Sequence, residues 1–307
     1  MTHDVLAWSL FPLIVALLGT FAVVGSTWDV ATPLGLAADA NPGLLILGAI
    51  LVFYPLVAVL ELAFPSRADW RRPHGDVRTD ALHLALTGPA ASTVHETLVH
   101  GALATVGVWV AGRLGVGLWP VAWPAAAQLA LALLIAELGH YWFHRVSHEN
   151  ALVWRLHATH HSARRLYWLN ATRFHPFDLF GLIACQSGPL FVLGAPPRAL
   201  LTYAIFTVAY GQMQHCNVAL RTPRLVDRIF STPGVHRWHH SIDAAVGNHN
   251  YGAVLSIWDL VFGTYLRPPE PFAGPVGIAD LPAFPTRYLA QLASPFRWQR
   301  ITAMKAT

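Results

Sequence analysis

The decisive stretch of this sequence reads Glu137-Leu-Gly-His140-Tyr-Trp-Phe-His144-Arg-Val-Ser-His148. It follows a run of 23 residues without formal charge, which extends from Arg113 to Glu137. About 20 helical residues cross the hydrocarbon layer of a bilayer. Side chains four positions apart share one face of a helix. The stretch therefore predicts a membrane-spanning helix whose last turns carry His140, His144 and His148 on one face.

Other uncharged runs of similar length indicate further spans. Four of them contain 24, 21, 19 and 22 residues and occupy positions 5–28, 40–60, 179–197 and 199–220. A sixth apolar stretch, 81–112, is interrupted by His83, His95, Glu96 and His100. This stretch is compatible with one polar-faced span inside a bundle, or with two shorter segments at the membrane interface.

Composition supports a membrane protein. Only 36 of the 307 residues, or 12%, are Asp, Glu, Lys or Arg, about half of the roughly 25% found in soluble domains. The mean hydropathy is +0.44. These values exclude a disordered chain and an ordinary soluble surface. The net charge of +4 does not indicate nucleic-acid binding, because the basic residues lie in clusters between apolar runs.

The distribution of basic residues predicts an orientation. If all six stretches cross the membrane, 18 of the 20 Lys and Arg residues fall on one side, and Arg113 and Arg198 fall on the other. Cytoplasmic loops carry the excess of basic residues. We therefore expect the side with 18 basic residues to face the cytoplasm, which requires an even number of spans. In a bacterial cell this predicts a multi-pass protein of the inner membrane.

Twelve of the 17 histidines fall between His140 and His249, in groups with metal-ligand spacing. Beyond the first stretch, the groups read His157-Ala-Thr-His160-His161, Gln212-Met-Gln-His215 and His236-Arg-Trp-His239-His240. A single histidine is usually structural, but neutral imidazole is also the commonest metal ligand. Eight or more histidines exceed the four to six ligands of one ion, so the count favours two metals. Structural zinc sites prefer cysteine-rich sets, and Cys185 and Cys216 lie outside these groups.

Carboxylates flank the histidine groups. We expect Glu137, Glu149 and Asp243 to accept hydrogen bonds from the ring N–H groups of ligands, as second partners of ligating histidines usually do. An imidazole-rich pair of metals at the mouth of a membrane bundle suits oxygen activation by iron. Such a position also suits an apolar substrate that reaches the site through the lipid.

These motifs resemble the fatty acid hydroxylase/sterol desaturase superfamily, in particular bacterial members similar to alkylglycerol monooxygenase and sterol desaturases. The resemblance covers roughly Leu129 to Tyr265. It rests on His144-Arg-x-x-His148, Leu156-His157-x-x-His160-His161-Ser162, Gln214-His215, Thr232-Pro233-x-x-His236-Arg-x-His239-His240 and Asn250-Tyr251-Gly252-x5-Trp258-Asp259-x-x-Phe262-Gly263-Thr264.

The resemblance implies an all-α integral membrane bundle of about four to six spanning helices with a cytoplasmic, histidine-rich metal-binding cap. We accordingly divide the chain into N-terminal membrane helices (1–128), a fatty acid hydroxylase domain with two further membrane helices (129–266) and a C-terminal cytoplasmic tail (267–307). The implied ligands of two iron ions are His144, His148, His157, His160, His161, His215, His236, His239 and His240. His140 is the alternative to His148 in the first motif, which can begin at either of two positions.

The resemblance also implies the reaction. Such an enzyme uses O2 and two electrons to hydroxylate or desaturate an unactivated C–H bond of a fatty-acyl or sterol-like lipid, and the motifs do not separate these outcomes. The chain has no flavin or haem fingerprint, so electrons come from a separate reductase, ferredoxin or cytochrome. The rival hypothesis is a non-enzymatic membrane protein that binds or transports metal. A hydrolase is disfavoured because the sequence has no GxSxG motif.

Overall fold

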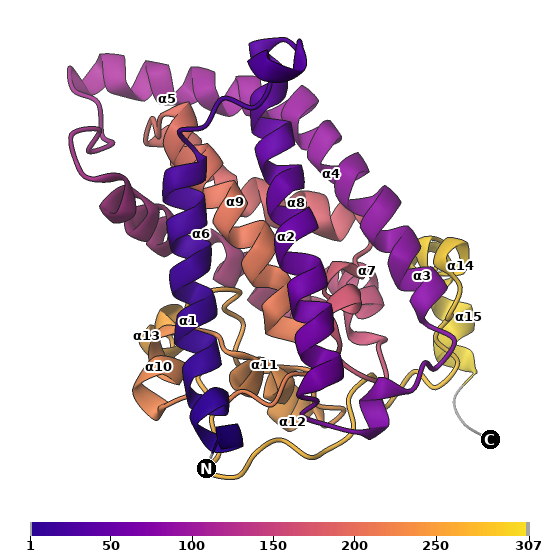
Figure 1. The fold of residues 1–307 in the computed structure, drawn as a ribbon. Helices are drawn as coiled ribbons and strands as arrows, with labels where there is room; N and C mark the ends of the chain where they lie inside the picture. The colour runs from indigo at the N-terminus through magenta and orange to yellow at the C-terminus, as the bar shows by residue number, and fades with distance from the viewer. Residues whose placement is uncertain (1, 305–307) are drawn as a thin grey trace.

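Residues 2–304 are described by a computed structural model, and they form a bundle of helices. The apolar helices α1 (Thr2–Gly25) and α2 (Asn41–Ala63) stand side by side along one flank and pack on α9 (Pro197–His215), as Figure 1 shows. Within the described part of the chain no β-strand forms, and backbone pairing outside helices is limited to isolated bridges such as Pro65 with Val218. The all-α prediction is confirmed.

Four helices are long and apolar enough to cross a membrane. They are Ala7–Gly25 within α1, Asn41–Ala63, Val77–Leu114 and α6 (Ala125–Glu149). The third is a continuous composite of α3 (Val77–Leu82), α4 (Gly88–His95) and α5 (Gly101–Leu114), joined by the π-helical turns His83–Thr87 and Glu96–His100. A straight helix of its 38 residues is about 57 Å long. Figure 1 shows how it bends, with α3 and α4 along the bundle and α5 across its end.

The stretch 81–112 belongs to one continuous, bent helix and not to two separate segments, because the chain stays helical throughout. Two of its three histidines hydrogen-bond to other helices. Nε2 of His83 lies 2.8 Å from Oε1 of Gln291, and Nε2 of His95 lies 2.9 Å from Oγ of Ser187.

Two predicted spans do not qualify by length and composition. Positions 179–197 form α8 (Pro176–Val192), which is apolar but has only 17 residues. Positions 199–220 form α9, whose last turns carry Gln212, Gln214 and His215 and are buried inside the protein. An uncharged run alone does not identify a span, because an uncharged helix covered by protein has the same charge pattern as one covered by lipid.

Close packing of α6 against α8 fixes the centre of the bundle. A Cβ atom on Gly139 would lie 1.9 Å from the carbonyl oxygen of Cys185, so only glycine permits this approach. On the same side of the molecule as the ends of α2 and α6, the chain folds into short helices, seen at the bottom of Figure 1. These are α10 (Arg224–Ile229), α11 (Pro233–His239), α12 (Ala244–Gly247) and α13 (Ile257–Val261), and the short helix α7 (Ala151–His161) lies above them, near mid-height in that view.

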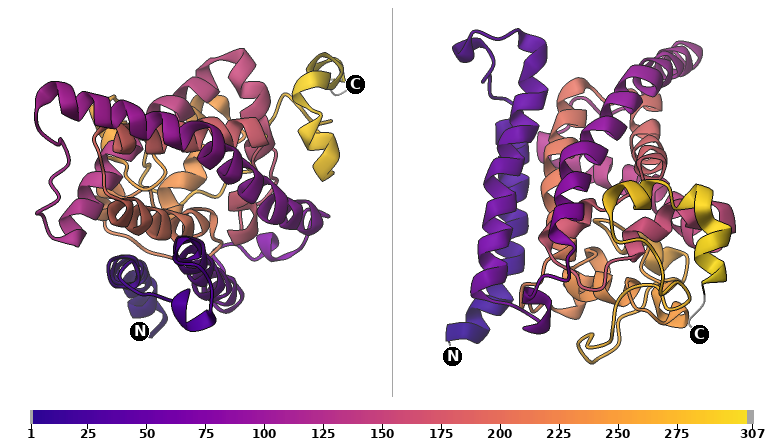
Figure 2. Two further views of the ribbon diagram at one scale, coloured as in Figure 1. Left: turned by 90° about the horizontal axis from the view of Figure 1, so that it is seen from above. Right: turned by 90° about the vertical axis from the view of Figure 1, so that its right-hand side faces the viewer.

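The C-terminal residues are not a free tail. Positions 268–287 are largely irregular, as the proline content indicates, and α14 (Tyr288–Leu292), the 3₁₀ turn Pro295–Arg297 and α15 (Trp298–Ala303) follow. Leu281, Phe284 and Ile301 pack on Ala158 of α7 in a buried cluster. The two views of Figure 2 show this segment, drawn in yellow, on the opposite flank from α1 and α2.

Candidate metal centre

The nine histidines implied as ligands lie in two adjoining groups. The first contains His144, His148, His157, His161 and His239, and the second contains His160, His215, His236 and His240. Within each group the ligand-capable atoms all lie within 4.8 Å of one another, and every ring except that of His148 is buried. The rings of His161 and His240, one from each group, have centroids 4.4 Å apart. The groups therefore form one continuous cluster.

The turn between α6 and α7 assembles most of the first group. Asn150 ends α6 and begins α7, and its Oδ1 accepts hydrogen bonds from the backbone N–H groups of Leu152 and Val153. An asparagine cap of this kind satisfies amides that have no partner within the helix. Because the chain reverses here, the histidine face of α6 meets the histidine face of α7. The predicted stripe on α6 is confirmed as a helical face.

The second group combines His160 of α7 with the end of α9, with α11 and with His240 at the C-cap of α11. His215 is the last residue of α9. The side chain of Thr232 caps α11 by accepting from the backbone N–H of Val235, and it donates to Oδ1 of Asp227. Asn250, which has a left-handed backbone with φ of 59°, donates to the carbonyl oxygen of Val235. These contacts hold α11 over the end of α9.

Imidazole nitrogens face one another at a spacing that suits a shared ion. The Nε2 atoms are 3.1 Å apart in the pair His144 and His157, 3.1 Å apart in His148 and His161, and 3.0 Å apart in His236 and His240. Two nitrogens that bind one ion at right angles, each at about 2.1 Å, are about 3 Å apart. Three further buried ring nitrogens lack a hydrogen-bond partner among the described residues: Nε2 of His239 and Nδ1 of His236 and His240. Buried polar atoms without partners are rare, so the donor set fits nitrogen-liganded metal ions.

Oxygen acceptors orient many of these rings. Asp178 Oδ2 lies 2.9 Å from Nδ1 of His157, and Asn170 Oδ1 lies 3.0 Å from Nδ1 of His215. In four other rings Nδ1 also lies within hydrogen-bond distance of an oxygen. For His144, His160 and His239 it is the backbone carbonyl oxygen of Tyr251, Arg173 and His249, respectively. For His148 it is the side-chain oxygen Oδ1 of Asn248. A ring that donates from Nδ1 keeps the lone pair of Nε2 free for a metal.

Burial keeps the histidines of the short helices neutral. It lowers the pKa of His157, His160 and His161 well below 6.5, and neighbouring imidazoles lower it further. The same causes lower the pKa of His236, His239 and His240. Neutral imidazole is the form that binds metal.

The expectation that Glu137, Glu149 and Asp243 accept from ligand rings is wrong. Oε2 of Glu137 accepts the backbone N–H groups of residues 253–255. Glu149 pairs with Arg145 at 2.8 Å, and Asp243 caps α12 by accepting from the backbone N–H of Ala245. Each of these three carboxylates accepts hydrogen bonds from groups other than a histidine ring. The carboxylate that does contact a ring is that of Asp178, on α8.

The segment after Asn250 supports the histidine cluster indirectly. Asp259 accepts the backbone N–H groups of Tyr251 and Gly252 and the hydroxyl of Thr264. The carbonyl oxygen of the same Tyr251 lies 2.7 Å from Nδ1 of His144. Asp259 therefore positions the ring of His144 through the backbone of Tyr251 rather than by direct contact.

The remaining histidines of the region lie outside both groups. His140 is buried on α6, where its Nδ1 lies 2.9 Å from Nε2 of Gln186. His175 caps α8 and contacts the carbonyl oxygen of Leu292. His249 makes a local hydrogen bond to the carbonyl oxygen of Val246. Asp178, Asn170 and Asn248 are the site residues that sequence reasoning missed. The one available signal was the lone carboxylate of Asp178 at the head of an apolar helix.

A cavity of about 770 Å³ opens on the first group. Its lining includes His148, His161 and His239 of the first group, together with Trp154 and Trp298. The cluster is thus accessible from the side of the short helices.

Comparison with known proteins agrees with this arrangement. The fatty acid hydroxylase family model matches residues 129–264. The chain is 42% identical over 243 residues to the ornithine lipid hydroxylase OlsE of Rhizobium tropici, covering 78% of this chain and 72% of that protein. It is 32% identical over 148 residues to human alkylglycerol monooxygenase, covering 48% of this chain and 33% of that protein.

A more distant relative is the very-long-chain aldehyde decarbonylase GL1-9 of Oryza sativa, which is 27% identical over 145 residues, or 46% of this chain and 55% of that protein. No solved structure matches the chain significantly. The residues that the family model matches include all nine grouped histidines, and the chain belongs to the fatty acid hydroxylase family.

Proposed function

We propose that the protein is a membrane-bound di-iron oxygenase that hydroxylates an unactivated C–H bond of a membrane lipid. The observation that carries the proposal is the division of nine histidines into two adjoining groups, one of five and one of four. That number of imidazoles fits two ions and exceeds what one ion binds. Imidazole suits iron as well as zinc, copper and nickel, and the relatives named above are a hydroxylase and a monooxygenase.

Bound iron would supply the reduction of O2, with two electrons from a separate reductase, ferredoxin or cytochrome. The residues of this chain do the rest. Asp178 and Asn170 accept from the Nδ1 atoms of His157 and His215 and so direct Nε2 of each ring toward its group. The buried walls around both groups keep bulk water from the reacting centre, and the cavity beside His148, His161 and His239 gives a route to the first group.

Hydroxylation is preferred to desaturation because the relatives with the higher identities carry hydroxylase or monooxygenase names. An ornithine-containing lipid is the first substrate to try, since the relative with 42% identity is an ornithine lipid hydroxylase. We further propose that the histidine end faces the cytoplasm of a cell with the protein in its inner membrane, in keeping with the 18-to-2 split of basic residues.

The test compares lipids from cells that express the wild-type chain, His160→Ala or His249→Ala under ¹⁸O2. His160 belongs to the second group, whereas His249 lies outside both and serves as the control. The wild type and the control should form a lipid heavier by one ¹⁸O atom, and His160→Ala should form none although it inserts normally. The metal-transport hypothesis would be favoured instead by two results together: no ¹⁸O in the lipids of any of the three strains, and uptake of iron or zinc into vesicles that depends on His160.

A further inference from the structure

The C-terminal segment carries a basic and apolar surface that the oxygenase chemistry does not use. We define the arginine face as Arg155 of α7 with Phe296, Arg297 and Arg300, which line a shallow cavity of about 630 Å³. We propose that the arginine face binds the anionic headgroup of a lipid in the bilayer that holds the protein, with phosphate or carboxylate as the recognised group.

The charges of the arginine face have no partners within the described chain. Arg297 and Arg300 are exposed, and no side-chain hydrogen bond or ion pair forms at either guanidinium. The Nε atom of Arg155 is buried and lacks a hydrogen-bond partner among the described residues. Other arginines, by contrast, pair with carboxylates, such as Arg165 with Asp76 and Arg173 with Asp80. The sequence from Leu281 to Thr307 contains no Asp or Glu, so this surface is uniformly basic.

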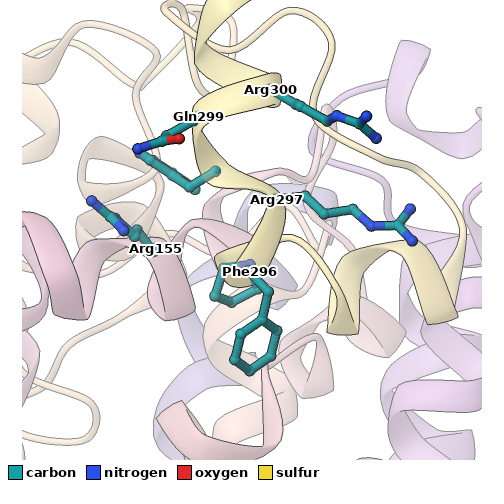
Figure 3. Close-up of a pocket in the computed structure, with 7 residues that line it drawn as sticks. Arg155, Phe296, Arg297, Gln299 and Arg300 are labelled. Carbon is teal, nitrogen blue, oxygen red and sulfur yellow. The ribbon is translucent and has the colours of Figure 1, made fainter.

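Exposed apolar side chains lie beside these charges. The exposed fraction is 77% for Phe296 and 75% for Leu289, among the highest values for large apolar residues in the protein. In Figure 3, Arg297 and Arg300 extend to one side of the segment and Phe296 points downward, while Arg155 of α7 lies on the other side. A surface that combines arginines with exposed aromatic and aliphatic side chains is typical of protein at a membrane interface.

The fold places the segment next to a spanning helix. Helix α14 contacts α3, at the start of the Val77–Leu114 span, and lies beside it in Figure 1. Gln291 of α14 hydrogen-bonds to His83 of the same span, and the hydroxyl of Thr79 donates to the carbonyl oxygen of Thr286. These contacts anchor the segment where the composite helix begins. Lipid of the same bilayer is therefore within its reach.

These observations favour a lipid over the other sources of negative charge. An acidic electron-donor protein would match the arginines but would not require the exposed Phe296 and Leu289. Free phosphate would match the arginines alone. The site also adjoins the metal centre, because Trp298 lines both the arginine face and the cavity that reaches His148 and His161.

The experiment counts lipids on the full-length protein, purified in detergent, by native mass spectrometry during titration with phosphatidylglycerol or phosphatidylcholine. The wild type should bind phosphatidylglycerol more tightly than phosphatidylcholine. Each arginine near an anionic surface contributes about 1 kcal/mol, so Arg297→Gln/Arg300→Gln should weaken phosphatidylglycerol binding by roughly 30-fold. Arg113→Gln/Arg198→Gln is the matched control, because it removes two arginines at the end of α5 and the start of α9 and should leave the affinity unchanged.

Unchanged melting temperature and metal content in both double variants show that the fold and the centre persist. Phe296→Ser keeps the charges and should weaken binding by several-fold through lost apolar contact. Equal affinity for the two lipids, or full phosphatidylglycerol affinity in Arg297→Gln/Arg300→Gln, overturns the proposal. So does displacement of the lipid by an equal concentration of inorganic phosphate, which identifies a free-anion site. Binding of an acidic ferredoxin without any lipid preference would identify a protein-docking surface and also overturns it.

Discussion

Among the described residues, Asp178 is the one carboxylate in direct contact with a grouped histidine, at 2.9 Å from Nδ1 of His157. In Asp178→Asn the amide can turn its NH2 group toward the ring, which favours the tautomer with the proton on Nε2 and blocks that ligand atom. Loss of such an outer partner typically weakens metal binding by about 10- to 100-fold. We expect the variant to release its metal at a correspondingly lower chelator concentration.

Asp243→Asn is the matched control for this measurement, because Asp243 caps α12 and contacts no grouped ring through its side chain. The two variants differ from the wild type by the same chemical change. Equal chelator midpoints for Asp178→Asn and Asp243→Asn would show that the contact with His157 does not tune the centre.

The neutral histidines also set a pH dependence for the metal-free protein. The folded-state pKa values of the histidines of α7 and α11 lie below the ordinary 6.5 because of burial. The unfolded chain therefore binds more protons than the folded chain once the pH falls through about 6.5, and the free energy of unfolding decreases there. After chelation, the melting temperature in detergent should fall between pH 7.5 and pH 5.5.

Bound metal excludes protons from the same nitrogens, so the metal-loaded protein should keep its melting temperature to a lower pH. A metal-free protein that melts at the same or a higher temperature at pH 5.5 is incompatible with buried neutral rings.

The sequence indicates which histidines gather in the cluster, but not which residues accept hydrogen bonds from their rings. The spacings His157-x-x-His160-His161 and His236-x-x-His239-His240 follow the helical period, so one sequence pattern predicts each face. The partners are distant in sequence: Asp178 is 21 positions from His157, and Asn248 is 100 positions from His148. No local pattern encodes a contact that only the packing of α8 or the loop after α12 creates.

At the scale of elements, the packing of α6 on α8 is the tightest constraint that the glycines reveal. In Gly139→Ala the new methyl group meets the carbonyl oxygen of Cys185, and overpacking of this kind costs about 1–3 kcal/mol. Because the histidine face lies on the same α6, we expect a lower melting temperature together with lower metal occupancy.

Gly19→Ala in α1 is the control, since nothing lies within 4 Å of its added Cβ. There, alanine should leave the melting temperature unchanged or raise it, because glycine within a helix costs about 0.5–1 kcal/mol. A Gly139→Ala protein as stable as Gly19→Ala would mean that α6 and α8 are not in backbone contact.

Helices are predicted correctly where a run of residues is both long enough to cross a membrane and free of charge. The first two spans and α6 follow from long uncharged runs, and the structure has helices there. For 199–220 the structure has a helix, α9, but its polar residues are buried and it does not meet the length and composition of a span. The sequence leaves 81–112 undecided because the two π-helical turns have no sequence signature.

At the scale of the whole molecule, the orientation in the membrane can be measured directly. In a Cys185→Ser background, Ala273→Cys reports on the side of the short helices and Leu118→Cys on the loop between α5 and α6, and both positions are exposed. In intact cells, a membrane-impermeant maleimide should label Leu118→Cys and spare Ala273→Cys. In inverted vesicles the labelling should reverse. Labelling of Ala273→Cys in intact cells contradicts a cytoplasmic metal centre.

Elemental analysis of the intact, detergent-purified chain tests most directly whether the two histidine groups act as one binuclear iron centre. Nine grouped imidazoles predict about two iron atoms per chain, and His160→Ala, which removes a ligand of the second group, should retain less. A wild-type chain that is fully folded and expressed with ample iron, yet carries one transition-metal atom or none, would contradict the account.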